Sequence, residues 1–266
     1  FWIVLSVSGS IPFILFGFGV VDSFFESMSG ITTTGATVIA GLDDLPKSLL
    51  IYRQLLQWLG GMGLIVLAIA VMPLLGIGGG QLFKTQTPGP MSEQRLTPRI
   101  TSTARALWSI YFVLTVLCIF AYRLAGMSYF DAVSHAFSTV SIGGFSTHDL
   151  SIGFFDSLSI EIVCITFMLL SAMSFAVHYS AIYRKQVLKY FYDPELRFFV
   201  SLLIVILGLV CLSLFANDID NPIRSGLFQT VSILTTTGFL TDEYSSWPAY
   251  ISFMLLVGAF IGACSG

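Results

Sequence analysis

Three parts of the sequence repeat one short pattern of hydroxyl-bearing residues and glycine. One glycine in each part, Gly35, Gly144 or Gly238, sets the alignment. Six positions before this glycine all three parts have serine, and three positions before it they have serine or threonine. The residue nine positions before it is polar in each part, namely Glu26, His135 and Gln229.

Such a pattern could bind a cation that has lost its water shell. Protein oxygen atoms must replace that water. A short extended segment ending in glycine can turn its carbonyl oxygens toward one axis, because glycine tolerates backbone angles that are closed to other residues. Threonine adds a hydroxyl oxygen on a stiff side chain, and a preceding helix would direct its negative C-terminal end toward the cation. Packing of transmembrane helices also uses Ser, Thr and Gly, but three copies in register favour a ring of oxygens.

The elements that must position these segments are predicted to be membrane-spanning helices. Of the 266 residues, 55% are hydrophobic and 10% are charged, against roughly 25% charged residues in a soluble domain. A bilayer-spanning helix needs about 20 apolar residues. Six stretches approach that length, at residues 1–20, 54–77, 106–122, 157–180, 198–216 and 247–264. The sequence therefore predicts an all-α integral membrane protein that is embedded in lipid.

The distribution of charge predicts the orientation of these helices. Eight of the twelve Lys and Arg residues lie in two loops: Lys84, Arg95, Arg99 and Arg105 in the first, and Arg184, Lys185, Lys189 and Arg197 in the second. Cytoplasmic loops are rich in Lys and Arg, so we place both loops in the cytoplasm. The repeated pattern then lies on the outer side, where each long connection contains a semi-apolar stretch that is too short to span and is a candidate re-entrant helix.

Other kinds of chemistry find little support in the sequence. The motifs GxxxxGK[ST], HExxH and GxSxG do not occur in a suitable context, so we predict no enzyme activity and no cofactor. The net charge of −3 argues against a nucleic-acid partner. We expect His135 to form local hydrogen bonds. We interpret Gly60, Gly61 and Gly63 as allowing a neighbouring helix to approach closely. The cysteines lie in apolar runs without a CxxC motif and are interpreted as small buried hydrophobic residues: Cys118, Cys164, Cys211 and Cys264.

The repeated pattern and its surroundings resemble the Trk-type potassium uptake proteins, the TrkH- and TrkG-like membrane subunits of the Trk/Ktr/HKT superfamily. The similarity covers essentially the whole chain and is carried by the runs FFESMSG and TTTGAT in residues 24–37, and by residues 53–63, 87–90, 135–148 and 193–195. The resemblance implies a pseudo-fourfold, cation-channel-like pore of four helix–pore-loop–helix repeats, three of which are at least partly present here. These are a first pore repeat at residues 1–80, a cytoplasmic loop at 81–105, a second repeat at 106–185, a cytoplasmic loop at 186–197 and a third repeat at 198–266. Both ends lie within apolar stretches, and we expect the chain to be a piece of a longer protein.

The resemblance also implies the site residues and the partners. By position, the K⁺ selectivity filter consists of Thr33, Thr34 and Gly35, then Ile142, Gly143 and Gly144, and finally Thr236, Thr237 and Gly238. An intramembrane gating loop in the third repeat would begin at Gly262, Ala263, Cys264, Ser265 and Gly266. The family implies K⁺ uptake across the bacterial inner membrane by a multi-pass homodimer that works with a cytosolic nucleotide-binding regulatory ring subunit, which would itself bind the nucleotide.

Each expected filter strand has one aligned glycine rather than the two of tetrameric potassium channels. Fewer rings of carbonyl oxygens should select less strictly, so we expect Rb⁺ to pass as well and extend the hypothesis to Na⁺. Two alternatives remain at this point. One is a related Na⁺-coupled or less selective cation transporter of the Ktr or HKT type, and the other is a structural membrane subunit whose Ser/Thr/Gly strings pack helices.

Overall fold

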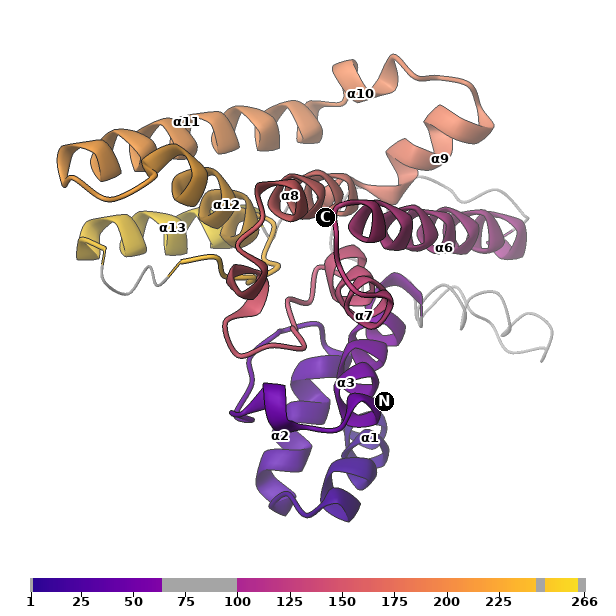
Figure 1. The fold of residues 1–266 in the computed structure, drawn as a ribbon. Helices are drawn as coiled ribbons and strands as arrows, with labels where there is room; N and C mark the ends of the chain where they lie inside the picture. Colours follow the sequence, from indigo (N-terminus) through magenta and orange to yellow (C-terminus); the bar gives the residue numbers. More distant parts are fainter. Residues whose placement is uncertain (1, 64–99, 243–246, 263–266) are drawn as a thin grey trace.

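The computed structural model describes residues 2–63, 100–242 and 247–262, and every regular element within these ranges is a helix. The described chain forms three units with the same order of parts (Figure 1): an outer helix, a short helix, an extended loop and an inner helix. This confirms the predicted all-α class.

The bounds of the elements show the recurrence. The first unit consists of α1 (Trp2–Phe16), α2 (Val20–Ile31), the 3₁₀ turn η1 (Leu42–Asp44), α3 (Lys47–Trp58) and the π-helical turn η2 (Leu59–Gly63). The second consists of α6 (Ile100–Leu124), α7 (Tyr129–Val140), the 3₁₀ turn η5 (Ser151–Phe155), α8 (Leu158–Ala172), α9 (Phe175–Tyr183) and α10 (Lys189–Tyr192). The third consists of α11 (Pro194–Ala216), α12 (Pro222–Leu234) and α13 (Ala249–Gly262).

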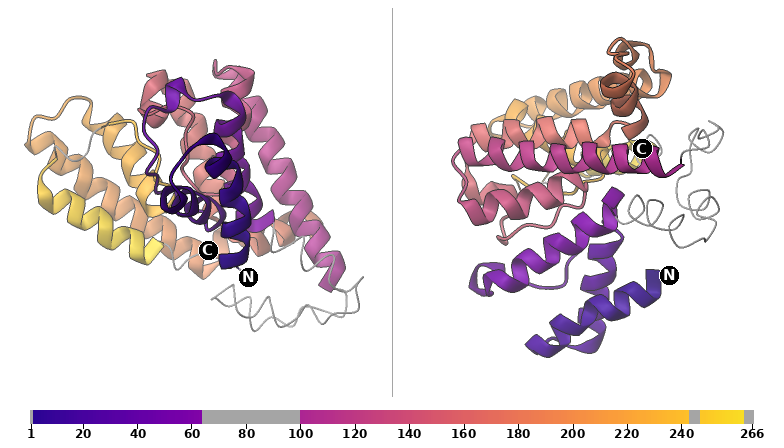
Figure 2. Two further views of the ribbon diagram at one scale, coloured as in Figure 1. Left: turned by 90° about the horizontal axis from the view of Figure 1, so that it is seen from below. Right: turned by 90° about the vertical axis from the view of Figure 1, so that its right-hand side faces the viewer.

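The units pack by one recurring scheme. Within each unit the short helix lies against its own outer helix, so that α1 contacts α2, α6 contacts α7, and α11 contacts α12. Between units, the inner helix of one contacts the short helix of the next, so that α3 packs on α7 and α8 packs on α12. Figure 2 shows the first unit and the third unit as separate groups of helices from two further sides. The scheme places the three short helices, α2, α7 and α12, toward the interior.

Burial follows this arrangement. The second and third units share one apolar core, and the first unit has its own around Phe13. Cys118 and Cys164 lie in the shared core without any exposure, as predicted, whereas Cys211 is only partly buried and Cys264 lies outside the described residues. The outer helices α6 and α11 instead expose large apolar side chains, such as Leu124 and Leu212. Such apolar surfaces suit contact with lipid, because the bilayer core contains no water that could form hydrogen bonds with polar groups.

Two described helices are long and apolar enough to cross a bilayer by length and composition: residues Arg105–Leu124 of α6, and α11. They match the predicted spans at 106–122 and 198–216, although α6 begins at Ile100, inside the loop predicted at 81–105. The predicted span at 157–180 is instead a pair of helices bent by 93°. Its break lies at Met173, where the backbone is extended, and His178 Nε2 lies 2.9 Å from the Leu170 carbonyl oxygen beside it. The predicted span at 54–77 begins in α3 and continues through η2 to Gly63, and residues 64–77 lie outside the described residues.

Candidate functional site

The three short helices end in the same way. The loop segments that follow them are defined here as the first (residues 32–37), the second (141–146) and the third (235–240). At the end of α2, the Thr33 N–H donates to Gly30 O at 3.0 Å and the Thr34 N–H donates to Ser29 O at 2.9 Å. The equivalent bonds run from Ile142 to Thr139 and from Gly143 to Ser138 after α7, and from Thr236 to Ile233 and from Thr237 to Ser232 after α12. This is the Schellman motif, which satisfies the last carbonyl groups of a helix.

The residue at the turn of each motif is unusual. A Schellman motif needs a left-handed backbone there, and glycine usually supplies it. Here the residues are β-branched: Thr33 with φ of 54°, Ile142 with φ of 55° and Thr236 with φ of 61°. A left-handed conformation costs such a residue about 1–2 kcal/mol. Backbone strain of this kind gathers at functional sites, and here it occurs at the same position in all three segments.

The three aligned glycines show that the segments lie side by side. Gly35, Gly144 and Gly238 also have a left-handed backbone, with φ of 77°, 77° and 83°. A Cβ atom added to Gly35 would lie 2.1 Å from Gly143 O, and one added to Gly144 would lie 1.9 Å from Thr237 O. The second segment therefore contacts both the first and the third, and the first also approaches the third, because the Cβ added to Gly35 would lie 3.6 Å from Thr237 O. An added Cβ on Gly238 would meet no described atom within 4 Å, so the three segments form an open arc.

The polar residue nine positions before each glycine anchors the outer end of its own segment in the first two units, and in the third unit it anchors the chain two residues beyond the segment. Both carboxylate oxygens of Glu26 accept from the Thr37 hydroxyl at 3.0 Å. His135 Nε2 lies 2.9 Å from the Ser146 hydroxyl, and its other ring nitrogen lies 2.9 Å from Asp131 O. In the third unit Gln229 donates to Asp242 O at 3.2 Å. The expectation that His135 forms local hydrogen bonds is confirmed. All three anchoring side chains are fully buried.

A buried ion pair joins the first and second segments. Arg53 on α3 donates to Glu26 from Nε at 2.7 Å, and its Nη2 lies 2.6 Å from the same carboxylate, with both side chains at 0% exposure. Arg53 also donates to Ser146 O at 3.2 Å and to the Thr37 hydroxyl at 3.0 Å. Its guanidinium carbon lies 4.4 Å from the centre of the Phe145 ring. A buried charge must be paired in this way to be tolerated.

One turn further along α3, Gln57 holds the second segment. Its Nε2 donates to Gly143 O at 2.6 Å, and its Oε1 accepts from the Phe145 N–H at 3.1 Å. Residues four apart lie on one face of a helix. Arg53 and Gln57 therefore hold the outer and the inner part of the second segment from one helix face, and both belong to the first unit.

Further polar contacts join the loops beyond the segments. The Asp149 carboxylate accepts from the Gly41 and Leu42 N–H groups at 3.0 and 2.9 Å. His148 forms a short hydrogen bond with Asp43, which holds the pKa of the Asp43 carboxyl below its usual value. The loop after the second segment is thus tied to the loop after the first.

An ion pair between a partly exposed arginine and a buried glutamate joins the second and third units. Arg224 on α12 donates to Glu161 on α8 from Nε at 3.0 Å and from Nη2 at 2.8 Å, and Nη2 also contacts Asp156 at 2.8 Å. Glu161 is the charged exception in its apolar stretch, and this bidentate pairing explains how it is accommodated.

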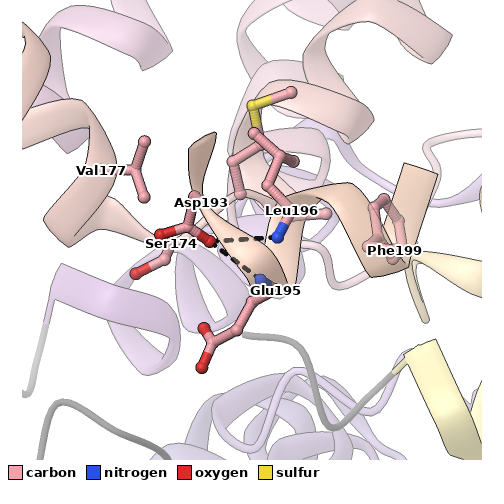
Figure 3. A pocket seen from close by; sticks show the side chains of 8 residues that line it. Ser174, Val177, Asp193, Glu195, Leu196 and Phe199 are labelled. Atoms are coloured by element: carbon pink, nitrogen blue, oxygen red, sulfur yellow. Dashed lines mark hydrogen bonds between the residues drawn. The ribbon is translucent and has the colours of Figure 1, made fainter. Parts of the chain in front are cut away.

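A small pocket lies elsewhere, where the break between α8 and α9 meets the start of α11 (Figure 3). One residue that lines the pocket is Asp193. Its carboxylate accepts from the Glu195 and Leu196 N–H groups, both at 3.1 Å, and so caps α11. None of its lining residues belongs to a loop segment, and Asp193 already has a structural role. We therefore place the candidate site at the loop segments.

The structure brings all nine predicted filter residues together in the three adjoining segments. Their role in binding K⁺ stays a prediction.

Of the predicted gating residues, 263–266 lie outside the described residues. A Cβ added to Gly262 would lie 2.1 Å from Leu234 O at the end of α12, and one added to Gly60 would lie 2.0 Å from Ile31 O at the end of α2. The close approach predicted for Gly60 is thus confirmed.

Arg53 and Gln57 were not predicted as site residues. The sequence signal that could have identified them is two polar residues, four positions apart, at the start of an apolar stretch. Within the described ranges, no three His, Cys, Asp or Glu side chains come together as metal ligands. The oxygen atoms that the loop segments offer to a cation are backbone carbonyls and hydroxyls.

Comparison with known proteins agrees with this arrangement. A family model described as TrkH, cation transport protein, matches residues 1–266. The Trk system potassium uptake protein TrkH of Halomonas elongata is 52% identical over 272 residues, which covers 100% of this chain and 56% of the relative. TrkH of Escherichia coli K12 is 45% identical over 273 residues, with the same coverage. The crystal structure of the potassium transporter TrkH from Vibrio parahaemolyticus matches with a TM-score of 0.82 and 47% identity, covering 97% of this chain and 54% of that one. The chain thus spans a little more than half the length of these relatives.

Proposed function

Because the chain belongs to the TrkH family of cation transport proteins, we propose that it is part of a potassium uptake protein in which the three loop segments form the selectivity filter. The filter residues would be 33–35, 142–144 and 236–238. The relatives that it matches over its full length are potassium uptake proteins.

The observation that carries this proposal is the threefold recurrence of one strained backbone. Each segment has a left-handed β-branched residue and, two positions later, a left-handed glycine. Helix packing explains why small and hydroxyl-bearing residues occur, but it does not require left-handed backbone at the same two positions of three segments. A filter accounts for the recurrence, because each strand must present its oxygen atoms in the same way to a shared cation.

The surroundings of the segments suit a dehydrated cation. The segments begin directly at the C-terminal ends of α2, α7 and α12, where the helix dipoles are negative. The site offers uncharged carbonyl and hydroxyl oxygens, which can replace the hydration shell of the ion. A pseudo-fourfold pore would need a fourth segment, and the open side of the arc beside Gly238 would accommodate it.

The finer features of the proposal follow the resemblance. Potassium would lose its water among the segments and then pass a gating loop that begins at Gly262. Rubidium would be accepted as well. We further propose a homodimer in the bacterial inner membrane that is controlled by a cytosolic nucleotide-binding subunit, with both basic loops facing that subunit.

The test is uptake of K⁺ and Rb⁺ by the full-length protein in cells that lack their own potassium uptake systems. Gly144→Ser is compared at matched expression, because its Cβ would lie 1.9 Å from Thr237 O and must displace the filter backbone. Gly208→Ser on α11 is the control, since an added Cβ there meets nothing within 4 Å.

We expect the parent to restore uptake, Gly144→Ser to change the preference for K⁺ over Na⁺, and Gly208→Ser to leave that preference unchanged. If Gly144→Ser lowers expression alone and the preference is constant, the segments are packing motifs and the proposal fails.

A further inference from the structure

We propose that Gln57 is a positioning residue that fixes the backbone of the second loop segment and thereby sets the cation preference. The inference rests on the proposed filter function and assigns part of it to a side chain from another unit. It follows from a difference among the three segments.

The first and third segments are braced by their own side chains. The residue before the aligned glycine is Thr34 in the first segment and Thr237 in the third. The Thr34 hydroxyl lies 2.8 Å from the Thr32 hydroxyl, and the Thr237 hydroxyl lies 2.8 Å from the Thr235 hydroxyl. Each pair bridges two positions of its strand from within.

The second segment cannot form this brace. Its residues at the same two positions are Gly143 and Ser141. Glycine has no hydroxyl, and the Ser141 hydroxyl donates instead to Ser138 O at 3.3 Å. The middle strand of the arc is therefore the one strand that lacks an internal side-chain pair among the three described segments.

The Gln57 amide occupies the place of the missing brace. It donates to Gly143 O at 2.6 Å and accepts from the Phe145 N–H at 3.1 Å, so it spans the aligned Gly144. The side chain is fully buried. A Cβ added to Gly143 would lie 2.4, 2.6 and 2.7 Å from Cδ, Oε1 and Nε2 of Gln57, which are its three nearest neighbours. Gln57 and Gly143 are thus complementary, because the amide fills the space that a threonine would need.

The position of this brace explains its importance for the whole arc. Gly143 O, which Gln57 holds, is also the atom nearest to an added Cβ on Gly35 in the first segment. A shift of this carbonyl would therefore change the contact between two filter strands. Gly143 does not have a left-handed backbone, so a side chain at this position causes no backbone strain. It is opposed only by the clash with the Gln57 amide.

The test is a compensating exchange in the full-length protein, measured as the ratio of K⁺ to Na⁺ uptake at matched expression. Gln57→Leu removes both hydrogen bonds, and Gly143→Thr drives a side chain into the amide. The double variant Gln57→Ala with Gly143→Thr frees the space and provides a hydroxyl that can pair with Ser141. Gln54→Leu is the matched control, because Gln54 is an equally buried amide on the same helix whose polar atoms have no hydrogen-bond partner among the described residues.

We expect each single change at the Gln57–Gly143 pair to lower the preference for K⁺ by about tenfold, because each disturbs both hydrogen bonds of the amide. A tenfold change corresponds to about 1.4 kcal/mol, which lies within the range that one or two buried hydrogen bonds contribute. The double variant should regain most of the preference, and Gln54→Leu should keep it. If Gln57→Leu does not fold, the comparison of Gly143→Thr with the double variant still decides the matter.

Two negative results differ in meaning. If Gly144→Ser changes the preference but Gln57→Leu does not, or if the double variant is no better than Gly143→Thr alone, the brace is structural and the inference is wrong. If neither Gly144→Ser nor the Gln57 variants change the preference, the proposed filter itself is wrong.

Discussion

Removal of the Glu26 charge should destabilise the protein strongly, because it breaks a fully buried ion pair. The carboxylate lies 2.6 Å from Nη2 and 2.7 Å from Nε of Arg53, and it accepts from Thr37 at 3.0 Å. Breaking a buried pair costs about 3–5 kcal/mol. After Glu26→Gln, Arg53 keeps its bond to Ser146 O and its contact with the Phe145 ring. We therefore expect a loss near the lower limit, about 3 kcal/mol.

A double-mutant cycle separates the pair from its surroundings. The full-length protein, Glu26→Gln, Arg53→Met and the double variant are purified in detergent, and their thermal unfolding is measured. For a chain of the relatives' length, about 480 residues since 272 residues are 56% of it, the entropy of unfolding is roughly 1 kcal/mol/K, so a loss of about 3 kcal/mol corresponds to a decrease of roughly 3 °C in Tm. The double variant should lose less than the sum of the single variants, since replacing both partners leaves no unpaired charge. Additive losses would refute the view that the two side chains act as a buried pair.

Three further predictions concern the backbone and the outer loops. Ile142→Gly should stabilise the protein by about 1 kcal/mol in thermal unfolding, because glycine accepts the left-handed backbone that isoleucine adopts under strain; a loss of stability would contradict this. Gly60→Ala should lose about 1–3 kcal/mol through its backbone clash, while Gly208→Ala should gain about 0.5–1 kcal/mol, and equal effects would refute the close approach. The hydrogen bond to His148 lowers the pKa of the Asp43 carboxyl in the folded protein. The bond therefore stabilises the fold fully when the pH is above the ordinary pKa of 3.8, and this stabilisation is lost as the pH falls from 3.8 through the lowered pKa. Asp43→Asn should therefore flatten the acid side of the stability profile, and an unchanged profile would count against the bond.

The recurring pattern could be predicted from the sequence because it is local. Alignment on Gly35, Gly144 and Gly238 identified the three segments, and the structure gives each of these glycines a left-handed backbone. The spans in α6 and α11 could also be predicted, because each is an apolar run of about the length that a helix needs to cross the bilayer.

The contacts between units could not be predicted in this way. Gln57 and Gly143 are 86 residues apart, and Arg53 and Ser146 are 93 apart. Periodicity and composition describe one helix at a time, so they carry no information on which distant segment a polar side chain meets. Glycine at position 143 departs from the threonine of the other two segments, and only the structure shows that a side chain from another unit fills the space.

The break at Met173 was missed for a different reason. The stretch from 157 to 180 is apolar and contains no proline, so hydropathy favours one continuous helix. The extended backbone at Met173 and the bond from His178 toward Leu170 O depend on tertiary packing. Ser171 and Ser174 flank the break, but serine is a much weaker signal of a kink than proline.

The most direct test of the central claim is a crystal structure of the full-length protein in Rb⁺ or Tl⁺, with the ion located by its anomalous signal. We predict peaks on an axis that is surrounded by residues 33–35, 142–144 and 236–238, within coordination distance of their oxygen atoms. Peaks at another place in a protein that transports these ions, with none among the three segments, would contradict it.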